Sequence, residues 1–73
     1  MKIYLEPRKQ FDQAIHDEQD DSIVYNYQKI LEVLVENFKA PEEPESYEIA
    51  DEYFWYNIER LKDYYSISFY YEE

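Results

Sequence analysis

The sequence has no glycine, no cysteine, few basic residues and no long apolar run. Without cysteine the chain forms neither disulfides nor a thiolate zinc site, and nothing indicates an oxidising compartment. Without glycine its turns depend on Asn, Asp, Pro or Ser, and a glycine-rich phosphate-binding loop is excluded. No stretch approaches the roughly 20 apolar residues of a membrane span, and residues 1–7 lack an apolar signal-peptide core. A cytoplasmic protein is expected, located in the host cytoplasm if a phage encodes it.

Acidic residues dominate the charge. Eighteen Asp and Glu against seven Lys and Arg give a net charge of −11, beyond the magnitude of about 2–8 that is usual for a soluble small domain. Such a field repels nucleic acid and anionic membranes and attracts basic surfaces. The charge predicts a basic protein partner, with no direct nucleic-acid or membrane partner. The alternative is an acidic chain that is only well solvated.

The length and composition predict a single acidic α+β domain over 1–73. A chain of 73 residues has little material for a deep cleft. Its 45% hydrophobic and 21% aromatic residues supply a core of large side chains, which argues against disorder.

Apolar spacing predicts a short helix and two main helices, over 8–16, 27–38 and 47–65. Asn26 and Ser46 are the expected caps of the main helices, because their side-chain oxygens accept bonds from backbone N–H groups in the first turn. Ser22 is an alternative cap. The last helix is expected to bury a stripe made of Tyr47, Ala50, Phe54, Ile58, Leu61 and Tyr65.

Two β-prone segments lie at the ends of the chain. Residues 2–6 precede Pro7, which stops a strand, and residues 66–71 alternate apolar and polar side chains. They are predicted to pair in a small antiparallel sheet. Residues 22–25 are interpreted as a further short strand, with the start of a helix as the alternative.

Three segments resemble a group of small phage- and prophage-associated proteins. They are residues 11–15 (F-D-Q-A-I), residues 24–27 (V-Y-N-Y) and residues 50–58 (A-D-E-Y-F-W-Y-N-I). The group has an F-D-x-A-I … V-Y-x-Y … A-x-E-Y-x-x-Y-N-I pattern. The resemblance implies a phage-related origin and a shared fold, and it carries over no catalytic residue. The group usually has glycine where this chain has His16 and in the helix connection at 40–45.

Metal binding and catalysis are not expected. Asp12 and His16 lie one helical turn apart, with further carboxylates at 17–21, but a calcium loop needs a tight glycine turn. There is no cysteine nucleophile, and the single histidine belongs to no recognisable triad. No metal, cofactor or catalytic residue is predicted, and the chain is not predicted to be an enzyme.

The outer face of the 47–65 segment is the strongest candidate for function. Acidic residues and one tryptophan recur there at spacings of three and four: Glu48, Glu52, Trp55, Glu59 and Asp63. Carboxylates one turn apart are separated by about 5.4 Å, similar to successive phosphates, so this ridge is expected to imitate a nucleic-acid backbone. A second predicted acidic patch consists of Asp17, Glu18, Asp20 and Asp21. The alternative is an ordinary solvated helix face.

These features predict a phage- or mobile-element-encoded inhibitor that occupies the basic surface of a nucleic-acid-handling host or defence protein. The alternative is a small homo-oligomeric structural or assembly protein whose acidity only confers solubility. In that case an exposed edge formed by 3–5 or 70–71 would pair with a second copy.

Overall fold

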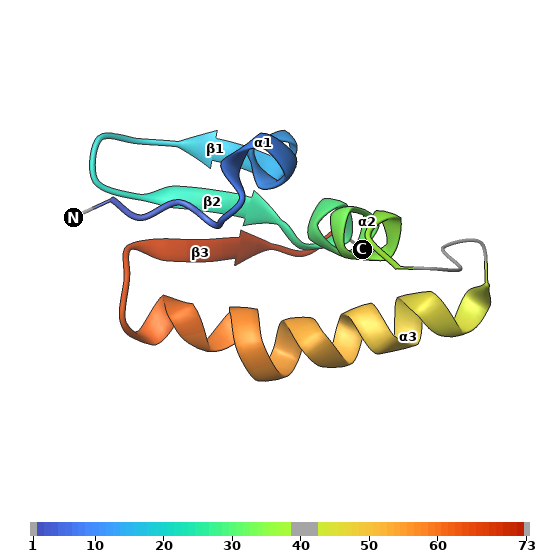
Figure 1. Ribbon diagram of the computed structural model, residues 1–73. Helices are drawn as coiled ribbons and strands as arrows, with labels where there is room; N and C mark the ends of the chain where they lie inside the picture. Colours follow the sequence, from blue (N-terminus) through green and yellow to red (C-terminus); the bar gives the residue numbers. More distant parts are fainter. Residues whose placement is uncertain (1, 39–42, 73) are drawn as a thin grey trace.

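A hairpin, a crossover through two helices and a final strand form a small α+β fold (Figure 1). The computed structural model describes residues 2–38 and 43–72. The helical elements are α1 (Arg8–Phe11), the 3₁₀ turn η1 (Asp12–Ala14), α2 (Tyr27–Glu36), α3 (Pro44–Tyr53), the π-helix η2 (Phe54–Ile58) and the 3₁₀-helix η3 (Glu59–Asp63). The strands are β1 (Ile15–Glu18), β2 (Ile23–Asn26) and β3 (Ile67–Tyr70).

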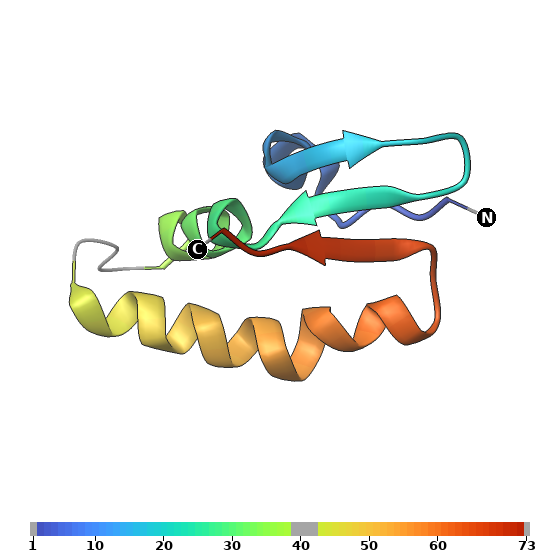
Figure 2. The same cartoon turned by 180° about the vertical axis from the view of Figure 1, so that it is seen from behind.

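In the described residues the strands form one mixed sheet in the order β1-β2-β3. The hairpin partners β1 and β2 are antiparallel, and β3 runs parallel to β2. Parallel neighbours need a long crossover, which α2 and the continuous helix from α3 to η3 provide. Both ribbon views show this long helix running beside β3 along the whole sheet (Figures 1 and 2).

The register separates an inner face of the sheet from an open one. Tyr25 is paired with Ile15 on one side and with Phe69 on the other, so these three side chains share the inner face. His16 is the extra residue of a bulge in β1, and its ring stacks on that of Tyr70 with centroids 4.2 Å apart. The sheet, the helices and the N-terminal segment all contribute to the buried core, which consists of Leu5, Phe11, Ala14, Ile23, Tyr25, Ile30, Leu31, Val33, Val35, Ala50, Phe54, Ile58 and Ile67.

The prediction that residues 2–6 form a strand paired with 66–71 is wrong. Residues 2–6 are extended chain without strand pairing, and β3 pairs with β2 instead. Side chains hold the segment in place: the backbone N–H of Leu5 donates to the buried Tyr25 hydroxyl at 2.9 Å. The Tyr25 oxygen accepts the hydrogen bond that a neighbouring strand would otherwise accept. The backbone N–H of Leu5 is therefore satisfied without strand pairing.

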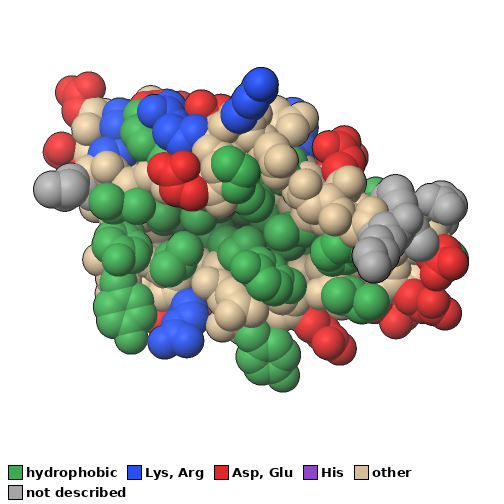
Figure 3. Space-filling view, in the orientation of Figure 1, with side chains coloured by type: hydrophobic (Ala, Val, Ile, Leu, Met, Phe, Trp, Pro, Cys, Tyr) green, Lys and Arg blue, Asp and Glu red, His purple; other side chains and the backbone are tan. Residues whose placement is uncertain are grey.

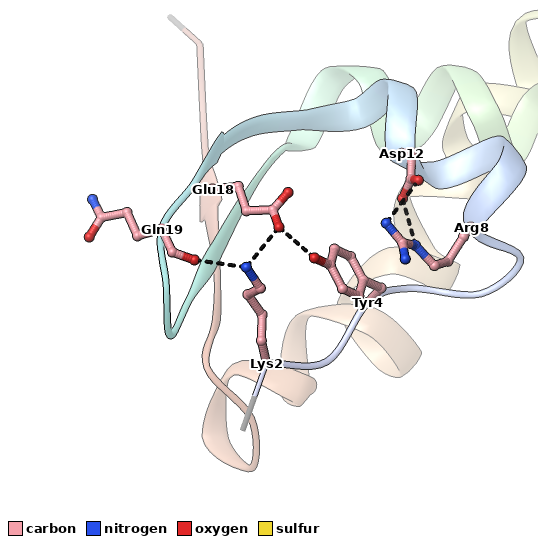
Figure 4. A network of polar contacts seen from close by, with 6 residues as sticks. All are labelled: Lys2, Tyr4, Arg8, Asp12, Glu18 and Gln19. Atoms are coloured by element: carbon pink, nitrogen blue, oxygen red, sulfur yellow. Dashed lines mark hydrogen bonds and ion pairs between the residues drawn. The ribbon is translucent and has the colours of Figure 1, made fainter.

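A polar network ties the same segment to the hairpin (Figure 4). Lys2 forms an ion pair with Glu18 at 2.8 Å and donates to the carbonyl of Gln19 at 3.0 Å. The hydroxyl of Tyr4 donates to the same Glu18 carboxylate. The guanidinium of Arg8 lies over the Tyr4 ring, 3.6 Å from its centroid. These contacts place residues 2–7 against the sheet, where they form the wall of a groove described below.

The predicted helix over 8–16 ends at Ala14, because the next four residues form β1. Phe11 and Ala14 are buried as the helical spacing predicts, but the β-branched Ile15 pairs with Tyr25. Sheet pairing therefore overrides a spacing that also fits a helix. Asp17 and Glu18, two members of the second predicted acidic patch, belong to this strand.

Predictions for the other elements are largely confirmed. Asn26 caps α2, and its side chain accepts from the backbone N–H of Lys29 at 3.0 Å. Strands β2 and β3 occupy the segments predicted at 22–25 and 66–71, and the predicted long helix is present but begins at Pro44 with Glu43 as its cap. Proline suits the first helical position, so Ser46 lies inside the helix and not at its cap. The stripe of Ala50, Phe54 and Ile58 is buried and Leu61 half-buried, whereas Tyr47 and Tyr65 are exposed.

Candidate partner-binding surface

The first half of the long helix is acidic, aromatic and exposed. Residues 43–59 include six carboxylates and neither Lys nor Arg: Glu43, Glu45, Glu48, Asp51, Glu52 and Glu59. Glu48 and Glu52 are both exposed and one turn apart in α3. Large exposed side chains accompany them, namely Ile49, Tyr53 and Tyr56. The structure thus places the first two residues of the predicted ridge together on an accessible surface.

The rest of the ridge does not continue the same stripe. The prediction assumed one α-helix throughout, whereas the chain passes through the π-helix η2 and then the 3₁₀-helix η3. These geometries change the number of residues per turn, so a spacing of three and four no longer keeps side chains in line. The Glu59 side chain is only 17% exposed and pairs with Lys62 at 2.7 Å. Glu59 is therefore a poor contact residue, while Asp63 is exposed.

Trp55 lies at the edge of an aromatic cluster. Its ring is parallel to that of Tyr71, with centroids 6.0 Å apart, and it remains 47% exposed. Its Nε1–H donates to the Oδ1 of Asp51 at 3.0 Å. The other members of the cluster are Tyr27, Phe54 and Phe69. The indole is thus held in a fixed orientation with one part open to solvent, which suits a contact residue.

Asp51 is the polar centre of this cluster. Its Oδ1 also accepts from the hydroxyl of Tyr27. Burial, followed by the hydrogen bond to Asp51, raises the pKa of Tyr27 to about 12. Burial also raises the pKa of Tyr71, helped by the nearby Glu59 charge. The four-residue spacing of Asp51 and Trp55 could have signalled their contact, but the approach of Tyr27 depends on the tertiary fold.

Alkaline pH is expected to destabilise the domain through Tyr27. The unfolded chain titrates this group near its ordinary pKa of about 10, while the folded state holds the proton up to about pH 12. The stabilisation is complete below the unfolded pKa and is lost as the pH rises through the folded pKa. The urea midpoint should therefore fall between about pH 10 and 12. The urea midpoint of the Tyr27→Phe variant should fall less steeply with pH than that of the unsubstituted protein. Equal slopes would contradict the assignment of this pH dependence to Tyr27.

The second predicted patch lies at the turn of the β1–β2 hairpin. Asp17, Asp20 and Asp21 are exposed there. Glu18 is different, because the hydrogen bonds from Lys2 and then Tyr4 hold its carboxylate and lower its pKa. Figure 1 shows the hairpin turn and the start of α3 at opposite ends of the molecule, with the end of η3 on the hairpin side. The structure does not join the two patches, but it places Asp63 at the hairpin end.

Comparisons with known proteins give no assignment. No protein-family model, curated protein or solved structure matches this chain. Within residues 2–38 and 43–72, no group of three His, Asp or Glu side chains is placed to hold a metal ion. No helix in that part of the chain is both long and apolar enough to cross a membrane.

Proposed function

We propose that this protein inhibits a nucleic-acid-handling host or defence protein by occupying its basic surface. The observation that supports this most strongly is the exposed acidic face of α3 within a run of residues, 43–59, that has no basic side chain. Glu48 and Glu52 project one turn apart, about 5.4 Å along the helix axis. Beside them, Trp55 and the exposed tyrosines supply large contact areas at a low entropy cost.

Part of the positive charge of the chain is paired with carboxylates outside α3. Three of the seven Lys and Arg residues are engaged with acidic neighbours elsewhere: Lys2 with Glu18, Arg8 with Asp12 and Lys62 with Glu59. Each of these three pairs neutralises its own carboxylate, so these basic side chains add little net positive charge. The acidic face therefore attracts a basic groove and repels nucleic acid.

The route to inhibition is competition. A protein that binds nucleic acid offers Lys and Arg side chains at the spacing of phosphates, and the carboxylates of α3 occupy that surface in place of the strand. The resemblance to phage-associated proteins supports a target in the bacterial host, because a phage gains from blocking an enzyme that attacks its genome. The acidic hairpin turn would widen the contact on a long groove.

The function is tested by capturing partners from a bacterial lysate at low salt and then challenging the captured complex. We expect short duplex DNA or RNA to displace the partner in a concentration-dependent way. We also expect binding to fall steeply between about 0.05 and 0.5 M salt, because the contacts are charge pairs at a solvated surface. A partner that resists both the competitor and the salt would contradict nucleic-acid mimicry.

One observation favours a second candidate, a homo-oligomeric assembly protein. Strand β3 ends the sheet order, and its Tyr70 is 42% exposed on the open face beside His16. A second copy pairing along this edge would cover it. Sedimentation equilibrium separates the two functions, since a dimer that persists unchanged at low and high salt favours assembly.

A further inference from the structure

An apolar groove runs along the face of the molecule shown in Figure 3. It has a volume of about 570 Å³ and lies between residues 3–7, the end of α2 and the second half of the long helix. Figure 3 shows hydrophobic side chains gathered across the middle of this face, with acidic ones toward its ends. The groove is lined mainly by Ile3, Leu5, Phe11, Leu34, Ile58 and Leu61.

The chemistry of the groove differs from that of the rest of the protein. Charged residues make up 34% of the sequence, yet among the described residues that line the groove only Glu6 is charged. The amide side chains that line the groove, Gln10, Asn37 and Asn57, are neutral and already hydrogen-bonded. Asn37 Nδ2 donates to Gln10 Oε1 at 2.9 Å, and Asn57 Nδ2 donates to the carbonyl of Tyr53 at 3.3 Å. The groove therefore accepts uncharged, apolar groups.

The apolar surface continues from the groove onto the exposed face of the long helix. Tyr53 lines the groove and is 50% exposed, while Ile49, one turn earlier, and Tyr56, one turn later, are 57% and 73% exposed. Glu48 and Glu52 are interleaved with these residues in the sequence and are also exposed. An occupant of this surface meets apolar groups in the groove and carboxylates beside it.

We propose that the groove and the exposed stripe of Ile49, Tyr53 and Tyr56 bind a basic amphipathic helix of the partner. The proposal rests on the proposed function and specifies the chemistry of the contact segment. Apolar side chains at i, i+3, i+4 and i+7 of that helix enter the groove. Lys or Arg side chains on its flank pair with Glu48 and Glu52, which have the same one-turn spacing.

Charge complementarity selects this occupant over two others, and the extent of the exposed apolar surface selects it over a third. A second copy of the chain brings its own charge of −11 to an acidic surface, and an anionic membrane is repelled in the same way. A small apolar molecule would fill the groove, because pockets of about 300–1,000 Å³ hold such ligands. It would leave Ile49 and Tyr56 uncovered, whereas a helix of several turns covers both the groove and the stripe.

The test uses four synthetic peptides of about 18 residues, long enough for roughly five helical turns. The first is an amphipathic Lys/Leu helix, the second has the same composition in scrambled order, the third replaces Leu by Gln, and the fourth replaces Lys by Glu. Calorimetric titration of the full chain at low salt measures each affinity. We expect the Lys/Leu helix to bind at least about tenfold more tightly than the scrambled and Lys/Gln peptides, and the Glu/Leu peptide not to bind.

A groove variant and a matched control locate the site. Ile49→Ala with Tyr53→Ala removes exposed apolar groups without changing charge, whereas Tyr65→Ala removes a ring of similar exposure, 45% against 50% for Tyr53, away from the groove. The double variant should bind the Lys/Leu peptide about five- to tenfold more weakly and should bind the Lys/Gln peptide with unchanged affinity. Tyr65→Ala should change neither. Thermal unfolding of both variants shows that the fold is retained, as expected for exposed positions.

Each contrary outcome points to a different error. Equal binding of the Lys/Leu and Lys/Gln peptides would remove the groove from the contact and overturn this proposal, while the acidic inhibitor remains. Equal binding of the Lys/Leu and Glu/Leu peptides would overturn the basic requirement. Failure of every basic peptide would count against the proposed function as well. If the protein forms a homodimer that Tyr53→Ala dissociates, the occupant of the groove is a second copy of the chain, and the proposal is overturned.

Discussion

Phe54→Ala is expected to remove most of the stability of the domain at room temperature. The Phe54 ring is completely buried, and its centroid lies 4.9 Å from that of Tyr27, 5.0 Å from Phe69 and 5.2 Å from Trp55. Truncating such a phenylalanine costs about 3–5 kcal/mol, and a small domain has a total stability near the lower end of about 5–15 kcal/mol. Removing the Phe54 ring removes the contact between the long helix, β3 and the start of α2. Near-ultraviolet circular dichroism follows the loss of aromatic packing, and urea unfolding measures the loss of stability.

The control for Phe54→Ala is Ile49→Ala in the same helix. Ile49 is 57% exposed, so its truncation should change the free energy of unfolding by no more than about 0.5 kcal/mol. Suppose instead that Phe54→Ala retains a cooperative urea transition and loses less than about 1 kcal/mol. In that case the aromatic cluster does not hold the long helix to the sheet, and the fold depends on the aliphatic core around Ile30 and Ile23.

Elements with an unambiguous local signal could be predicted from the sequence. The helix after Asn26 combines a strong cap with a clear apolar stripe, and β3 alternates Ile67, Ser68 and Phe69. The long helix was predictable because Ala50, Phe54 and Ile58 recur at a helical spacing. In each case the residues nearby in the chain determine the structure, so no knowledge of partners is needed.

Elements whose structure depends on distant partners could not be predicted. Ile15 fits a helical face with Phe11 and also a strand opposite Tyr25, and only the tertiary pairing decides between them. Residues 2–6 have the composition of a strand, but the parallel crossover brings β3 to β2 and leaves them without a strand partner. The change to π and 3₁₀ geometry after Tyr53 has no local sequence signal in this chain.

The same division applies to the candidate site. Exposure of Glu48 and Glu52 follows from helical periodicity, because they lie opposite the buried stripe within a regular α-helix. The half-buried position of Glu59 does not follow, since it depends on the irregular turns before it. The groove was not predicted either, because its walls come from residues 3–7, α2 and the long helix. Sequence periodicity identifies faces of single elements and misses surfaces shared among several.

Charge reversal on α3 is expected to abolish binding while the fold survives. Glu48→Lys with Glu52→Lys changes the net charge from −11 to −7, since each substitution adds two units. Both positions are exposed, so the free energy of unfolding should change by no more than about 0.5 kcal/mol per site. Two lysines facing a basic groove replace attraction with repulsion, and like-charge contacts cost up to several kcal/mol. Affinity for the captured partner should fall at least about tenfold in calorimetry, and displacement by DNA should become easier.

The matched control is Glu32→Lys with Glu36→Lys in α2. These residues are also exposed and one turn apart, and their reversal gives the same net charge of −7 from positions on α2. We expect this variant to keep most of the affinity and to lose only association rate, because the long-range field weakens while the contact surface remains intact. Equal losses in both variants would mean that overall charge, and not the face of α3, governs binding. Full binding by the α3 variant would place the interface elsewhere, with the hairpin turn at Asp20 and Asp21 as the next surface to reverse.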